Sequence, residues 1–175
     1  VTFFVHHKNY LSGDNARQLV ADGGMHEKAN RGTAPLKIQL DDRSTVVLEA
    51  GARLLYPQHF AGSKREVYLE GEAFFDVAHD ADRPFYVYYN NLVTHVLGTS
   101  FHIRTNPQQK QIEVTVRSGK VEVYEKTPAR NKPVRTASSN GVILTPNQKV
   151  VYSEDSRQFE ALLADDPLPL LPVAP

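Results

Sequence analysis

Apolar residues recur at every second position through most of the chain between residues 36 and 153. A period of two is typical of β-strands that bury one face, because successive side chains point to opposite sides of a strand. The alternating stretches are short, turn residues separate them, and no helical pattern lies between them. The sequence therefore predicts an all-β fold, an antiparallel β-sandwich or β-roll built from consecutive hairpins, with little helix.

Three turns flanked by alternating stretches predict the clearest hairpins. They lie at Glu70-Gly71, at Ser118-Gly119 and at Pro146-Asn147. A further turn is expected over residues 41–44, where aspartate side chains can accept hydrogen bonds from nearby backbone amides.

The two ends of the chain lack this alternation of apolar and polar residues, so the sequence divides into three parts. Residues 1–35 are predicted to be irregular, with at most one helical turn at 16–21, and residues 36–153 form the β domain. Residues 154–175 are expected to contain a short helix, for which Ser156 is the candidate cap. The proline-rich stretch after it is expected to be an extended linker toward a C-terminal subdomain.

Charge and cysteine content exclude several classes of protein. The 20 basic residues balance the 20 acidic ones, whereas a nucleic-acid-binding protein usually shows a basic excess or stripe. The chain has no cysteine, which excludes disulfides, thiolate metal sites and cysteine nucleophiles. No apolar run approaches the roughly 20 residues that a transmembrane helix needs.

The candidate metal and catalytic groups do not form a convincing set. His95 and His102 are not spaced as a local ligand pair, and no nearby residue completes a metal site. The acidic pairs lie in or beside predicted turns, where carboxylates commonly have structural roles. No phosphate loop, dinucleotide fingerprint or nucleophile elbow is present. We therefore predict no metal, no cofactor and no enzyme.

The aromatic residues allow a packing interpretation and a binding one. Phe75, Phe85 and Phe101 are expected in the core, whereas Tyr86 and Tyr88 share the opposite face of a strand. Packing is the favoured interpretation, but if they are exposed, Tyr86 and Tyr88 become candidates for binding a partner protein. An exposed tyrosine row could also stack on sugars, so a carbohydrate-binding β-sandwich module is the alternative function.

The dipeptide Gly98-Thr99 also allows two interpretations. Glycine within a strand-like run marks a bulge or a close approach of two backbones. A threonine hydroxyl forced against the preceding carbonyl can attack it, and water can then open the resulting ester. The residues alone favour a structural bulge over this single-turnover self-cleavage at Gly98 and Thr99.

Seven short motifs follow one another along the predicted β domain, at residues 40–46, 55–57, 60–62, 66–77, 83–85, 96–101 and 116–123. In this order, the motifs resemble the periplasmic domain of the FecR family of sigma-factor regulators, in a Bacteroidetes-like form. Arg43 stands where the family usually has glycine, and we expect this to change the turn geometry and little else.

The resemblance implies a periplasmic sensor domain of a single-span inner-membrane anti-sigma factor. Such a protein relays a signal from the signalling domain of a TonB-dependent outer-membrane transporter to an extracytoplasmic-function sigma factor. It does so by protein contact and by regulated cleavage by periplasmic and membrane proteases. The cytoplasmic region that binds the sigma factor and the C-terminal subdomain thought to meet the transporter are expected outside this sequence. Some family members cleave themselves at the bond that corresponds to Gly98-Thr99.

Overall fold

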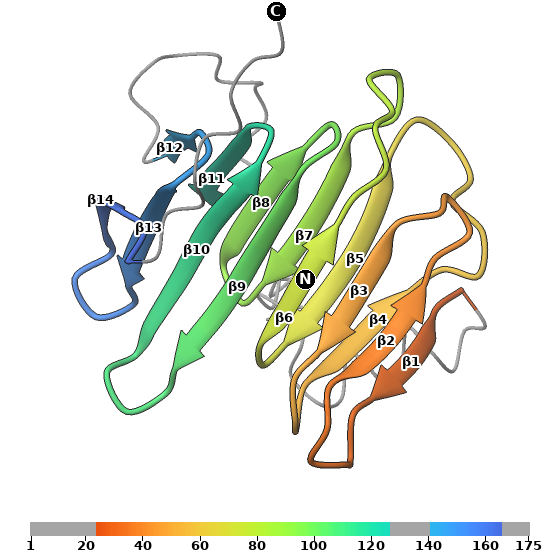
Figure 1. The fold of residues 1–175 in the computed structure, drawn as a ribbon, viewed down its shortest axis with the longest axis horizontal. Coiled ribbons are helices and arrows are strands. Elements are labelled where there is room, and N and C mark those ends of the chain that lie inside the picture. The colour runs from red at the N-terminus through yellow and green to blue at the C-terminus, as the bar shows by residue number, and fades with distance from the viewer. Residues whose placement is uncertain (1–23, 127–140, 166–175) are drawn as a thin grey trace, which may run out of the picture.

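A computed structural model describes residues 24–126 and 141–165. They form two seven-stranded β-sheets, which stack face to face (Figure 1). The elements of these two ranges are all strands, so the predicted all-β sandwich is confirmed. Within the same ranges, no helix is long and apolar enough to cross a membrane.

Each sheet contains strands from both halves of the chain. In sheet A the spatial order is β1 (His26–Ala29), β4 (Arg53–Tyr56), β5 (Arg65–Glu70), β7 (Phe85–Tyr89), β8 (Leu92–Val96), β11 (Val121–Glu125) and β12 (Gly141–Leu144). In sheet B it is β14 (Gln158–Leu163), β13 (Gln148–Ser153), β10 (Gln111–Ser118), β9 (Ser100–Asn106), β6 (Ala73–Asp76), β3 (Thr45–Leu48) and β2 (Leu36–Gln39). Neighbouring strands are antiparallel except β5 and β7, which pair in parallel.

The three turns predicted to close hairpins instead carry the chain from one sheet to the other. β5 lies in sheet A and β6 in sheet B, and the same switch separates β10 from β11 and β12 from β13. These hairpin predictions were wrong because a hairpin and a sheet-switching connection share the same alternation and the same turn residues. True hairpins join β2 to β3, β4 to β5, β7 to β8, β9 to β10 and β13 to β14.

The inward faces of the two sheets form one apolar core. Phe75, Phe85 and Phe101 are fully buried, as predicted, and the rings of Phe75 and Phe101 stack at 5.1 Å between centroids. Because each inward position lies between two outward ones, the same alternation that builds the core leaves two outer faces available for contacts.

Two predictions about the ends of the chain require correction. The helix predicted near Ser156 is wrong, because residues 158–163 form strand β14 on the edge of sheet B. Pairing with β13, and the packing of Phe159 on Tyr152 at 4.8 Å, override the local helical preference. The N-terminal part predicted to be irregular contains strand β1. The predicted helical turn at 16–21 and the proline-rich end lie outside the described residues.

Candidate self-cleavage and interaction sites

Gly98 and Thr99 lie in the connection between β8 and β9, where the chain again switches sheets. Thr99 is 3% exposed, and its hydroxyl donates a hydrogen bond to the carbonyl of Lys120 at 3.0 Å. The Thr99 carbonyl accepts a hydrogen bond from the amide of Val77 at 3.0 Å. The segment is therefore held from both sides.

Two glycines permit this close backbone approach. A Cβ atom on Gly98 would lie 2.5 Å from the Cα of His79, closer than such atoms can come. Gly119 has a φ of 81°, and a Cβ there would lie 2.7 Å from both the Gly98 carbonyl oxygen and Thr99 Oγ1. The Thr99 hydroxyl oxygen and the Gly98 carbonyl oxygen thus border the same small space beside Gly119.

A fully buried arginine, Arg65, holds this connection against the neighbouring loops. All five of its guanidinium N–H groups have acceptors, so no donor of the side chain is unsatisfied. The acceptors are Asp42 Oδ2 and the carbonyl oxygens of Ala78, Asp80, Arg83 and Leu97, at 2.6 to 3.4 Å. The last of these carbonyls directly precedes Gly98, so the arginine fixes the backbone beside the Gly98-Thr99 bond.

The turn over residues 41–44 completes this buried network. Asp42 accepts hydrogen bonds from the backbone and hydroxyl of Ser44, at 2.9 and 2.7 Å, as well as from Arg65. The Ser44 hydroxyl accepts in turn from the amide of Ala78 at 3.0 Å. Arg43 has a φ of 73°, a conformation that glycine adopts at little cost and other residues adopt with strain.

A tyrosine-rich face covers the outer side of sheet A. Cross-strand pairing places Tyr68, Tyr88, Val93 and Tyr124 in one row over β5, β7, β8 and β11. The rings of Tyr68 and Tyr88 stack at 5.0 Å, and Tyr88 donates a hydrogen bond to Glu66 at 2.7 Å.

A second row beside the first contains Glu66, Tyr86, His95 and Glu122. The Tyr86 ring stacks on His95 at 4.8 Å, and Lys64 lies 5.5 Å from the centroid of Tyr86. Tyr86 and Tyr88 are therefore half-buried by ring stacking and are absent from the core.

The phenol groups of Tyr86, Tyr88 and Tyr124 remain neutral at physiological pH. Burial raises the pKa of Tyr86 and of Tyr88, and the neighbouring Glu66 carboxylate raises both further. Burial likewise raises the pKa of Tyr124 to about 12. The face therefore presents neutral phenol groups together with flat apolar rings, a combination common at protein interfaces.

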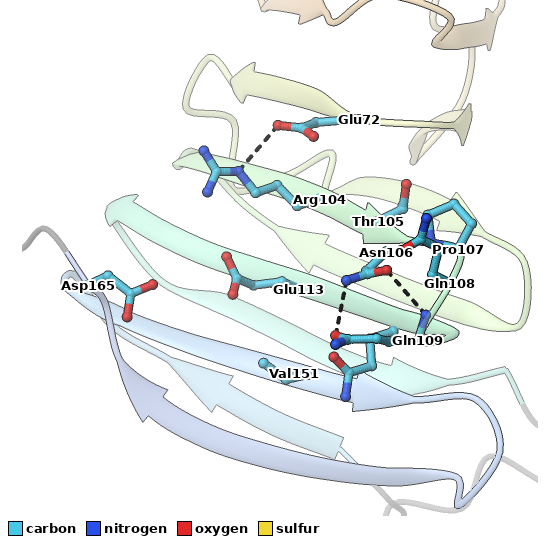
Figure 2. Close-up of a pocket in the computed structure, with 11 residues that line it drawn as sticks. Glu72, Arg104, Thr105, Asn106, Pro107, Gln108, Gln109, Glu113, Val151 and Asp165 are labelled. Carbon is cyan, nitrogen blue, oxygen red and sulfur yellow. Dashed lines mark hydrogen bonds and ion pairs between the residues drawn. The ribbon is translucent and has the colours of Figure 1, made fainter.

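The outer side of sheet B carries a polar groove of about 600 Å³ (Figure 2). Arg104 contacts Glu72 at 3.2 Å on one wall, and Asn106 is hydrogen-bonded to Gln109 at the end of the groove. No aromatic residue lines this groove, and a smaller neighbouring one contains Phe74. The aromatic rings that could stack on a sugar thus lie mainly on the other sheet.

The two histidines considered as metal ligands lie on different sheets. His95, on β8, is paired with Glu122 at 2.9 Å, and His102, on β9, lies 3.1 Å from Glu72. Within residues 24–126 and 141–165, no three His, Asp or Glu side chains are grouped as metal ligands. The acidic residues near turns are engaged in the structure, as Asp42 and Glu72 illustrate.

Sequence reasoning missed Arg65, Tyr68 and Tyr124. A signal for Arg65 was present, because the period of two places it on the inward side of its strand with Val67 and Leu69. Tyr68 and Tyr124 come from strands whose neighbours could not be known without the sheet order.

Comparisons with known proteins identify the family of the chain. The model of the FecR protein family matches residues 31–122, and the chain belongs to this family. Two crystal structures of a protein from Parabacteroides distasonis that is assigned as an anti-sigma factor are similar, each with 28% identity and a TM-score of 0.68. The matches cover 81% and 80% of this chain. They cover 61% and 60% of the solved chains, so this chain spans about three fifths of their length. No curated protein matches the sequence.

Proposed function

We propose that the chain is the periplasmic sensor domain of a membrane-anchored anti-sigma factor. It relays a signal from the signalling domain of a TonB-dependent outer-membrane transporter to an extracytoplasmic-function sigma factor. The FecR family match over residues 31–122 carries this proposal, and the similarity to a protein assigned as an anti-sigma factor supports it. Protein contact, followed by cleavage by periplasmic and membrane proteases, transmits the signal.

The tyrosine-rich face is the proposed contact surface. Tyr86 and Tyr88 offer rigid rings at low entropic cost, and the neutral Tyr86 hydroxyl can donate a hydrogen bond to a partner. The alternative of a carbohydrate-binding module is less well supported, because the polar groove on sheet B has no aromatic lining. A sugar-binding groove would place such rings in its concave wall.

The full-length regulator in its source bacterium provides the test of this contact. Reversible crosslinking followed by mass spectrometry should recover a transporter signalling domain with the wild-type protein. Replacing both Tyr86 and Tyr88 by alanine should abolish that recovery and alter transcription from promoters that depend on the sigma factor. The matched control is Phe74→Ala, which removes a half-buried aromatic ring from the outer face of sheet B. The proposal would be contradicted if the double variant still recovered the transporter. It would also be contradicted if the wild-type protein failed to recover it.

Self-cleavage between Gly98 and Thr99 is the second part of the proposal. The Thr99 hydroxyl oxygen attacks the Gly98 carbonyl carbon, the C–N bond breaks, and the hydroxyl proton moves to the Thr99 nitrogen. Water then hydrolyses the ester and leaves two fragments. The shared space beside Gly119 supports this step.

Intact mass after prolonged incubation tests the cleavage. The wild type should give two fragments whose masses add up to that of the intact chain plus one water. Hydroxylamine should accelerate cleavage by opening the ester itself, which leaves the N-terminal fragment as a hydroxamic acid. Thr99→Ala should remain a single species. An uncut chain in both samples would rule out the reaction.

A further inference from the structure

The edge strands at the two ends of the sandwich expose different residues. At one end, β1 and β2 carry exposed charges at Glu27, Lys28 and Lys37, which discourage the addition of another strand. The other end, formed by β12 and β14 (Figure 1), carries most of the large apolar side chains that are exposed among the described residues. These are Ile143 at 62%, Leu162 at 41% and Leu163 at 76%.

Among residues 24–126 and 141–165, β13 is the only strand paired with β14, so one side of the β14 backbone has no strand partner in these ranges. The amide of Ala164 donates to the carbonyl of Asn147 at 2.8 Å, which identifies these two residues as a hydrogen-bonded pair of the antiparallel ladder with β13. Such pairs alternate with non-hydrogen-bonded ones. The N–H and C=O groups of Phe159, Ala161 and Leu163 consequently point away from β13, toward the open edge of the sheet.

The side chains of Phe159, Ala161 and Leu163 extend the apolar layer between the sheets. Phe159 and Ala161 pair with the core residues Tyr152 and Val150. Leu163 follows on the same side of the strand yet is largely exposed, because the layer ends at this edge. An added strand with apolar residues on this side would cover it.

Charge distinguishes between the strands that could be added. Glu160 lies on the opposite side of β14 and makes no ion pair with any residue of the described ranges. Among the described residues of this end, Lys149 is paired with Asp165 and Glu113, and Arg157 is paired with Glu125. The charge that β14 itself carries, at Glu160, is therefore negative and available.

We propose that the free edge of β14 binds an extended segment of a partner protein as an eighth strand of sheet B. The segment carries apolar residues beside Ala161 and Leu163 and a lysine or arginine opposite Glu160. A symmetric pairing of β14 with β14 of a second copy does not fit, because β14 contains no basic residue and no register of β14 against itself places one opposite Glu160. This surface is separate from the tyrosine-rich face, and the proposal does not depend on self-cleavage.

A capped seven-residue peptide of alternating valine and lysine serves as the probe, with binding followed by amide NMR. Ala161→Pro removes the central free N–H without removing a hydrogen bond to β13, so the ladder should persist. Ala161→Val keeps the N–H and is the matched control. We expect Ala161→Pro to weaken binding about tenfold or more, Ala161→Val to leave it unchanged, and amide shifts to centre on β14.

A valine–glutamate peptide should bind about tenfold more weakly than the lysine peptide, and Glu160→Lys should reverse this preference even if Ala161→Pro fails to fold. Equal binding to Ala161→Pro and Ala161→Val, equal affinity for both peptides, or shifts on another surface would overturn the proposal. A dimer in sedimentation that disappears in Ala161→Pro would assign the edge to a second copy and would overturn it as well.

Discussion

Replacing Arg65 by methionine should remove a large share of the stability of the fold. Methionine is an unbranched apolar side chain that replaces the aliphatic stem of arginine but withdraws five hydrogen-bond donors and one charge. Asp42, whose side chain is 4% exposed, is then left as a buried carboxylate without its cation. Breaking a buried ion pair from one side costs about 3–5 kcal/mol, against a total stability of about 5–15 kcal/mol for a domain.

Urea denaturation followed by far-UV circular dichroism measures this loss. With a denaturant slope of about 2 kcal/mol per molar, the midpoint should fall by about 1.5–2.5 M. The chain has no tryptophan but eight tyrosines, so tyrosine fluorescence provides a second probe of the same transition. Agreement between the two probes supports two-state unfolding.

Two companion variants separate the buried pair from a general loss of charge. Arg104→Met removes a cation whose side chain is 58% exposed and which is paired with Glu72; its cost should not exceed about 1 kcal/mol. Adding Asp42→Asn to Arg65→Met removes the unpaired buried carboxylate. The double variant should therefore lose less stability than the sum of the losses in the two single variants. A midpoint shift below about 0.5 M for Arg65→Met would refute the reasoning, because it would mean less than about 1 kcal/mol.

Three further changes test other features of the structure. Arg43→Gly should raise thermal stability by about 1 kcal/mol, because φ at this position is positive; a lower melting temperature would show that the Arg43 side chain matters more than the backbone strain. Gly119→Ala should cost at least about 2 kcal/mol more than Gly51→Ala, since both have positive φ but only the first would bring a Cβ against other atoms; equal losses in urea would contradict this. Burial lowers the pKa of His102, so the His102 imidazole binds a proton at higher pH in the unfolded chain than in the folded one. The free energy of unfolding should therefore decline as the pH falls below about 6.5. His102→Gln should flatten that decline in melting temperature between pH 7.5 and 5.5, and an unchanged slope would assign the decline to other groups.

Alternation along the sequence was enough to predict which side chains face inward. Phe75, Phe85 and Phe101 are buried because the period of two is a property of each strand alone. Pairing between strands could not be predicted in the same way. Gly71, for example, has a φ of 89°, and a Cβ there would lie 2.9 Å from Ala52. Its role depends on contact with a residue 19 positions earlier, which no local turn pattern reveals.

The candidate sites were predictable to the extent that they lie within one strand. Tyr86 and Tyr88 share a face by their spacing alone, whereas Tyr68 joins them only through the parallel pairing of β5 with β7. Arg65 was overlooked because charged residues are rarely buried unless they are paired. Its partner, Asp42, is 23 positions away in a turn.

The sheet order determines what a break in the backbone after Gly98 would do. Residues before the break supply β1 to β8 and residues after it supply β9 to β14, so each sheet would be divided along a single seam. These seams are the β8–β11 ladder in one layer and the β6–β9 ladder in the other. The two pieces would stay assembled through backbone hydrogen bonds and shared apolar packing, as a non-covalent heterodimer of complementary fragments. Only a force or a binding event that parts both ladders together would set them free.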